Sequence, residues 1–153
     1  MKFEELLTAL GLASQEQVDE AVKAGACSLQ FDKKITINIE HDRNTGTAQA
    51  YCEVSRVPAT HKDAFFAVLL QAHMFGTATD GCMFGFDPNQ HHVILFKTLP
   101  LDLLDNTAAI SQLEALVNQS IRWNAYLPQL IDSWGDRVTQ EALSTAHAMA
   151  VRS

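Results

Sequence analysis

The sequence is poor in cysteine, and its few cysteines have none of the spacings that disulfide frameworks or zinc sites use. Cys27, Cys52 and Cys82 are the only three in 153 residues, and no two of them are separated by two residues. Small secreted domains usually carry an even number of cysteines that pair with one another. The odd count therefore indicates a protein of a reducing compartment.

Basic clusters and long apolar runs are also missing. The chain has 11 basic and 18 acidic residues, a formal net charge of −7, and Lys33–Lys34 as its only adjacent basic pair. Nucleic acids and anionic membrane surfaces are bound through clustered Lys and Arg, so neither is expected as a partner. The longest apolar run, 64–70, is far shorter than the roughly 20 residues of a membrane span. Glu4 and Glu5 stand where a signal peptide would be basic and then apolar, so we expect a cytoplasmic protein without membrane insertion.

Catalytic motifs are absent as well. The sequence contains no G-x-S-x-G, H-E-x-x-H, P-loop or glycine-rich dinucleotide motif. His91 and His92 are neighbours on a predicted strand, so their side chains point to opposite faces and do not readily chelate one metal. The cysteines occupy apolar strand positions, where buried and inert thiols are usual. We therefore expect no enzyme activity, no metal and no cofactor.

What the sequence has is the pattern of one α+β domain. Its length suits a single core that buries roughly 70% of the unfolded chain's surface. Apolar periodicity predicts helices over 2–12, 14–25, 60–75 and 105–127, and alternation predicts strands over 27–31, 35–39, 48–54, 82–86 and 91–99. The main order is helix, three strands, helix, two strands, helix, which favours an antiparallel sheet with flanking helices. Pro128 is expected to break the last helix, dividing a domain over 1–128 from a helical C-terminal extension over 129–153.

The helix predicted over 60–75 carries more apolar surface than a monomer needs. Phe65, Leu69 and Ala72 form one stripe, and Phe66, Leu70 and Met74 form a second beside it. One stripe is enough for a helix packed on a core. Between 64 and 96 the only charged residues are Asp80 and Asp87. The pattern predicts a surface that meets a partner.

A series of short motifs resembles the class I type III secretion chaperones, the CesT/Tir-chaperone family. These motifs are Val57-Pro58 before the apolar helix, the segments 71–76 (QAHMFG) and 85–88 (GFDP), then 99–105 (LPLDLLD), 112–117 (QLEALV) and Arg122-Trp123. The resemblance covers roughly residues 3–127. The chain departs from the family pattern in the longer, helical link over 14–25 and in the long tail after Pro128.

The resemblance implies a homodimer that binds the N-terminal segment of a type III secreted effector and keeps it extended and competent for secretion. The effector would add a strand to a sheet edge and place apolar side chains in grooves, with the secretion apparatus as a further partner. An alternative of another class is a regulatory dimer of this fold that sequesters a regulator of secretion genes. A third is a housekeeping domain with a small-molecule pocket.

Candidate site residues follow from the apolar stripes and the resemblance together. We expect effector binding by the first helix and the adjacent strands, at Phe3, Leu6, Leu7, Leu10, Leu29, Phe31, Ile35 and Ile37. The alternative is that these side chains form only the core, since amphipathic stripes usually face one. We expect the dimer interface at Phe66, Leu70, Met74, Phe75 and Phe84, the alternative being one wide face buried within the monomer.

Overall fold

A five-stranded antiparallel sheet with one long helix across it forms the frame of the protein. The computed structural model describes residues 1–12 and 14–151, except for the side chains of 136–139, 141–143 and 146–151. The helices are α1 (Phe3–Ala9), α2 (Gln15–Ala24), α3 (Lys62–His73) and α4 (Asn106–Val151), with short 3-10 helices at Met74–Gly76 (η1) and Leu101–Leu103 (η2). The strands are β1 (Ala26–Phe31), β2 (Ile35–Asp42), β3 (Thr47–Arg56), β4 (Met83–Asp87) and β5 (His92–Pro100). The α+β prediction is confirmed.

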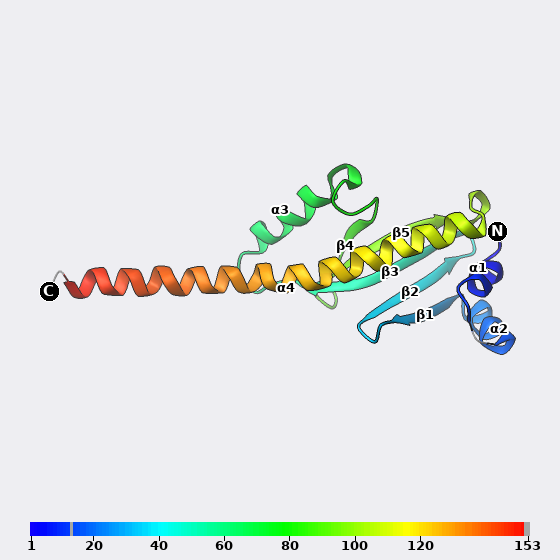
Figure 1. The fold of residues 1–153 in the computed structure, drawn as a ribbon, viewed down its shortest axis with the longest axis horizontal. Coiled ribbons are helices and arrows are strands. Elements are labelled where there is room, and N and C mark those ends of the chain that lie inside the picture. Colours follow the sequence, from blue (N-terminus) through cyan, green and yellow to red (C-terminus); the bar gives the residue numbers. More distant parts are fainter. Residues whose placement is uncertain (13, 152–153) are drawn as a thin grey trace.

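The strand order is β1-β2-β3-β5-β4, and each neighbouring pair is antiparallel. Figure 1 shows α4 running along one face of this sheet, with α3 on the side of α4 away from β1 and β2, and with α1 and α2 near the N-terminus. Alternation decides which side chains reach the core: the inward positions of β2 and β3 are buried under α4. These positions are Ile35, Ile37, Ile39, Ala48, Ala50, Cys52 and Val54.

Local capping chemistry explains several element ends. The backbone N–H of Gln17 donates to Ser14 Oγ at the start of α2, and that of Ala108 donates to Asp105 Oδ1 at 2.8 Å before α4. Gly25 ends α2 in the left-handed conformation, with φ 71°. By contrast, α3 begins after His61, which has φ 59°, so this helix starts at Lys62 and not at residue 60 as predicted. The first helix is also shorter than predicted and ends at Ala9.

Pro128 does not end the last helix, contrary to the prediction from sequence. α4 continues through it to Val151, although a proline inside a helix removes one hydrogen bond and costs about 3 kcal/mol. Pro128 is exposed, so solvent can reach the backbone there. Beyond it Ile131 and Trp134 still pack on the core, and Trp134 stacks on His61 with ring centroids 5.7 Å apart. These contacts favour a continuous helix despite the lost bond, and the division at residue 128 stays a prediction.

The distal part of α4 projects beyond the sheet in Figure 1. Despite its length, neither this helix nor any other in the described part of the chain is apolar enough over a long enough stretch to cross a bilayer.

Candidate functional site

The edge strand β1 presents a row of apolar side chains that the core only half covers. Cys27, Leu29 and Phe31 face the same side as the buried isoleucines of β2, which they oppose in register: Leu29 lies opposite Ile37 and Phe31 opposite Ile35. α4 packs chiefly on β3 and β5 and less on β2. The helix therefore leaves the inner face of β1 partly open.

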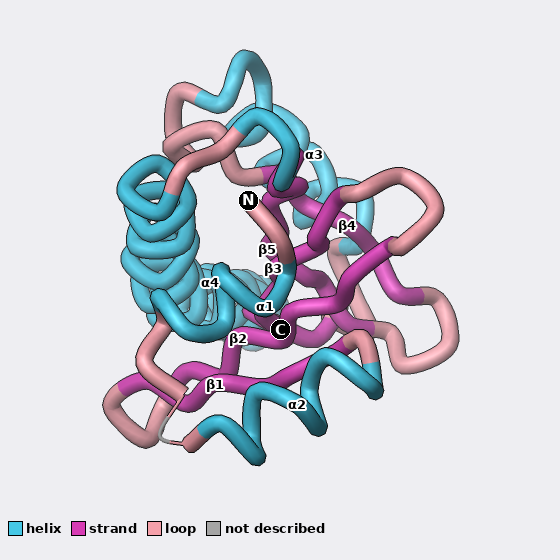
Figure 2. The backbone as a smooth tube through the Cα atoms, turned by 90° about the vertical axis from the view of Figure 1, so that its right-hand side faces the viewer, coloured by secondary structure: helices cyan, strands magenta, loops and turns pink. Residues whose placement is uncertain are grey.

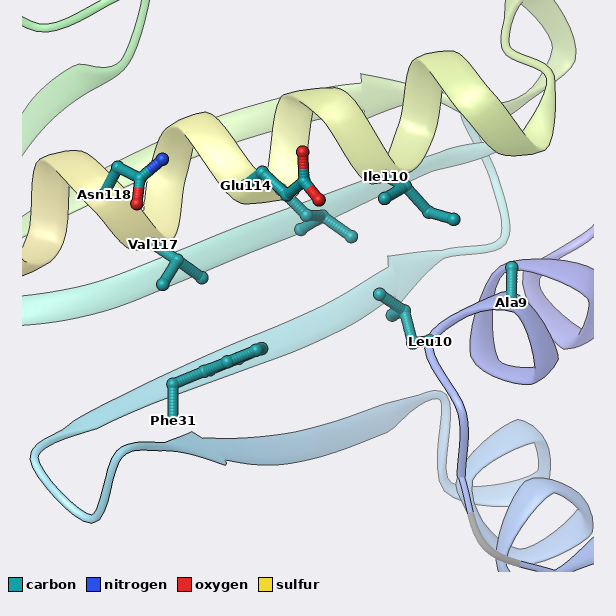
Figure 3. Close-up of a pocket in the computed structure, with 8 residues that line it drawn as sticks. Ala9, Leu10, Phe31, Ile110, Glu114, Val117 and Asn118 are labelled. Atoms are coloured by element: carbon teal, nitrogen blue, oxygen red, sulfur yellow. The ribbon is translucent and has the colours of Figure 1, made fainter.

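A hollow of about 450 Å³ lies between the end of α1, the end of β1 and the first turns of α4. We call it the α1–α4 groove. Figure 3 shows Phe31 and Leu10 on one side of it and the aliphatic side chains of Ile110 and Val117 on the other. Its lining is Ala9, Leu10, Phe31, Ile110, Leu113, Glu114, Val117 and Asn118. The groove is thus mostly apolar, with one carboxylate and one amide as its polar side chains.

A second hollow, of about 530 Å³, flanks the other half of β1. It lies between α2 and residues 26–29, with Leu12 and Glu20 among its lining residues. Figure 2 shows α2 lying beside β1 at this edge of the sheet. Within the described sheet β1 pairs with β2 on one side and has no strand on the other. The open strand edge therefore has a hollow at each end, the arrangement that an added peptide strand needs.

The position of α2 is held by Arg43 from the turn after β2. Its Nη2 donates to the carbonyl oxygens of Val22 and Lys23 at 2.7 and 3.0 Å, and the backbone N–H of His41 donates to Gly25 O at 2.8 Å. A guanidinium on the last carbonyls of a helix satisfies acceptors that would otherwise lack donors. Sequence reasoning missed this role, because a turn arginine shows no sign of its distant partner.

The structure divides the eight expected effector-binding residues into two sets. Phe3, Leu6, Leu7, Ile35 and Ile37 are buried in the core and are at most 4% exposed. Leu10, Leu29 and Phe31 are half-buried and border the two hollows. A fully buried side chain supports the surface from beneath without contacting a bound peptide. In this structure the first set therefore fits the alternative, that these side chains form only the core.

Six of the eight residues that line the groove were not among the candidates, including the two aliphatic residues Ile110 and Val117 of α4. Ile110 and Val117 lie seven residues apart on α4, beside the buried positions Ala109, Leu113 and Leu116. A seven-residue spacing keeps both on one flank of the helix. This second apolar flank was the available signal in the sequence.

The expected dimer residues lie on a different, convex surface. Leu70, Met74 and Phe75 are 70%, 57% and 91% exposed, and we call these three residues the α3 ridge. Phe66 and Phe84 are half-buried beside it. Phe66 makes an edge contact with Phe86 at 5.6 Å between centroids, and Phe84 makes one with Trp123 at 5.1 Å. The structure thus places three of the five expected residues on the exposed α3 ridge and the other two, both aromatic, half-buried beside it.

The titratable groups of these regions do not suggest covalent chemistry. Burial raises the pKa of the Cys27 thiol and that of the Cys82 thiol, the latter to about 11, so both stay protonated at neutral pH. The described residues hold no group of three His, Cys, Asp or Glu side chains that could bind a metal ion. The chemistry that the site offers is apolar burial and backbone hydrogen bonding.

The fold matches solved structures, and the sequence matches a family model. The structure is similar to the one titled "Crystal Structure of the ExsC-ExsE Complex", with 18% sequence identity and a TM-score of 0.58, over 83% of this chain and 97% of that one. It is also similar to the heterodimeric complex ExoU-SpcU from the type III secretion system of Pseudomonas aeruginosa, with 16% identity and a TM-score of 0.62, over 80% of this chain and 95% of that one. A third similar structure is the ExoT-SpcS complex from Pseudomonas aeruginosa, with 19% identity and a TM-score of 0.55, over 78% of this chain and 95% of that one.

At these identities the likeness concerns the fold. No protein of curated function matches the sequence. The model of the Tir chaperone protein (CesT) family matches residues 3–124, which span α1 to the middle of α4 and include both the groove and the ridge. The match covers well over half of the chain, so this protein belongs to the Tir chaperone protein (CesT) family.

Proposed function

We propose that this protein is a cytoplasmic class I type III secretion chaperone, which binds the N-terminal segment of a secreted effector and keeps it extended. One observation carries the proposal: the half-exposed apolar row of β1 runs along an open strand edge between two hollows. Family membership supports it, as do two structural neighbours, one titled as a chaperone–effector complex and the other as a complex from a type III secretion system.

Binding in this mode needs both the strand edge and the hollows. A peptide paired with β1 satisfies its backbone groups but loses about 1–2 kcal/mol of conformational entropy for each residue that it orders. Each apolar side chain that it buries returns about 1.5–3 kcal/mol. Alternate side chains of an added strand face the same side, so apolar residues in the client can reach the α1–α4 groove and the Leu29 side of the row.

The homodimer belongs to the same proposal. The α3 ridge exposes three large apolar side chains on a chain whose fold is complete without them. Ridges of this kind on small proteins mark contacts with other proteins. Two copies joined through their ridges would leave both β1 edges open for a client.

The experiment is coexpression of the protein with N-terminal segments of candidate secreted proteins, followed by light-scattering mass measurement. We expect a mass near twice 16.9 kDa for the protein alone and a stable complex of that dimer with one segment. Copurification of a small regulator in place of a secreted protein would support the regulatory alternative. A protein that ignores every segment tested, yet is stabilised by a small molecule, would contradict the proposal.

A further inference from the structure

The segment that follows α3 is built as a tight, closed loop. A Cβ on Gly76 would lie 2.9 Å from Gly81 Cα, so the two glycines approach at a distance that other residues do not allow. Thr79 is fully buried, its hydroxyl donates to the Cys82 carbonyl at 2.6 Å, and the Gly81 N–H donates to Gly76 O at 3.1 Å. The tight loop therefore holds the backbone of Phe75, the residue before it, in a fixed position.

In a single copy of the chain, both the backbone conformation of Phe75 and the exposure of its side chain are energetically unfavourable. Its backbone is left-handed, with φ 59° and ψ 11°, which costs an L-residue other than glycine about 1–2 kcal/mol. Its side chain is also 91% exposed, so a large apolar ring stands in water. Strained conformations persist where the surrounding structure enforces them, and they gather at binding sites. Phe75 has the properties of an anchor residue that enters a partner's pocket.

A pocket of matching chemistry lies close to Phe75 in the same chain. It has a volume of about 630 Å³, lies between α3 and α4, and is lined by Val68, Gln71, Ala72, Ala78, Arg122, Trp123 and Tyr126. Trp123 and Tyr126 make an edge contact at 5.6 Å, and Trp123 Nε1 donates to Gln119 Oε1 at 3.2 Å, which fixes the indole ring. The small side chains of Ala72 and Ala78 leave room for a ring, and Arg122 can meet its face.

The anchor and the pocket point to a second copy of this chain as the occupant. A two-fold contact requires one surface that complements itself, so an anchor beside a pocket can be exchanged reciprocally between copies. Ala78, in the pocket wall, belongs to the loop that presents Phe75, and Leu70 and Met74 lie on the helix that forms another wall. A peptide client would fill the pocket but leave its neighbour Phe75 in water.

We propose that Phe75 of each copy inserts into the α3–α4 pocket of the other and thereby selects the chain's own copy as its partner. This inference rests on the homodimer of the proposed function and adds to it the residue and the pocket that make the contact specific.

Crosslinking between two different variants tests the contact. A tagged Phe75→Cys chain is mixed with an untagged Gln71→Cys chain, and the pair is oxidised; the second chain keeps its own Phe75, so half of the contact remains. We expect a disulfide between tagged and untagged chains. Wild-type chains should give none, because Cys52 and Cys82 are buried and the half-buried Cys27 lies on β1, at the opposite edge of the sheet from β4. A Leu103→Cys chain in place of Gln71→Cys should also give none. A stable mixed dimer without this crosslink, or with equal crosslinking to Leu103→Cys, would overturn the inference.

Phe75→Lys gives an independent readout, since the new ammonium would face Arg122 of the partner. The dimer dissociation constant should rise at least about a hundredfold, because two buried rings are lost per dimer, each worth about tenfold or more. Leu103→Lys, at a residue 83% exposed near the start of α4, should leave the mass unchanged. A Phe75→Lys chain that dimerises as the wild type does would refute the anchor. Client binding, measured on the same variants, decides the chaperone proposal separately, because the groove residues are unchanged in both.

Discussion

The α1–α4 groove and the α3 ridge are both apolar, but they have opposite shapes. In the groove, Leu10 and Phe31 are half-buried around a hollow beside an open strand edge. On the ridge, Leu70 and Phe75 protrude from a helix and a rigid loop. A hollow with free backbone groups suits an extended chain that brings its own side chains, whereas a rigid projection suits a folded partner with a matching pocket. Shape, more than hydrophobicity, distinguishes the two surfaces.

Leu7→Glu and Leu10→Glu should show where the groove ends and the core begins. Leu7 has no exposure, and a buried carboxylate without a partner costs several kcal/mol, comparable with the whole 5–15 kcal/mol stability of a domain. We expect Leu7→Glu to unfold the protein and Leu10→Glu to leave it folded but unable to bind a client. Thermal denaturation followed by circular dichroism, together with client titration, separates the two. A folded Leu7→Glu protein that loses only client binding would show that Leu7 belongs to the groove.

On the ridge the same kind of change should act on assembly alone. Leu70 is 70% exposed in the single chain, so Leu70→Asp removes no core packing. We expect a folded monomer, with an unchanged circular dichroism spectrum and a light-scattering mass near 16.9 kDa. A Leu70→Asp variant that stays dimeric would show that the dimer interface lies elsewhere than on the α3 ridge.

Within the groove, Phe31→Ala should weaken client binding about tenfold or more, since a buried aromatic side chain contributes about 1.5–3 kcal/mol. Gln30→Ala is the matched control, because Gln30 is the preceding residue of β1 and is exposed on the opposite face. Calorimetric titration of both variants with one client segment measures the difference. Equal losses would mean that the client pairs with the backbone of β1 without using the apolar row.

The smallest effect is expected from the polar face of the sheet, which belongs to neither surface. Tyr51 donates a hydrogen bond to Glu40 at 2.7 Å, and this bond raises the pKa of the phenol to about 12. A pKa raised by folding contributes stability below the ordinary pKa of about 10, and this contribution is lost as the pH rises from 10 to 12. Tyr51→Phe should flatten that part of the stability–pH curve, measured by urea denaturation, and leave client binding and dimer mass unchanged. A change in client binding or in dimer mass would show that the client or the dimer contact reaches this face of the sheet.

Much of the fold could be predicted because its signals are local. Alternation in β2 and β3 marks the face that α4 covers, and Ser14, Gly25 and Asp105 mark helix ends by their own chemistry. The continuation through Pro128 could not be predicted, since it depends on Trp134 meeting His61 from a distant segment.

The site was only partly predictable for the same reason. The stripe of α1 contains Leu6, Leu7 and Leu10 at equivalent spacing, but only the path of α4 determines that the first two are covered and the third is half open. The second apolar stripe of α3 was visible in the sequence, and its members Leu70 and Met74 are exposed in the structure. The left-handed backbone of Phe75, by contrast, runs against the preference of a bulky residue and has no sign in the sequence.

Amide hydrogen exchange of the protein with and without a bound client segment tests the role of the β1 edge most directly. We predict that the client slows exchange along β1, at residues 26–31, and at the groove side of α4 near Ile110 and Val117, while η1 around Phe75 exchanges as it does in the free dimer. Protection at η1 and α3, with β1 unchanged, would contradict the assignment of the β1 edge and the α1–α4 groove to the client.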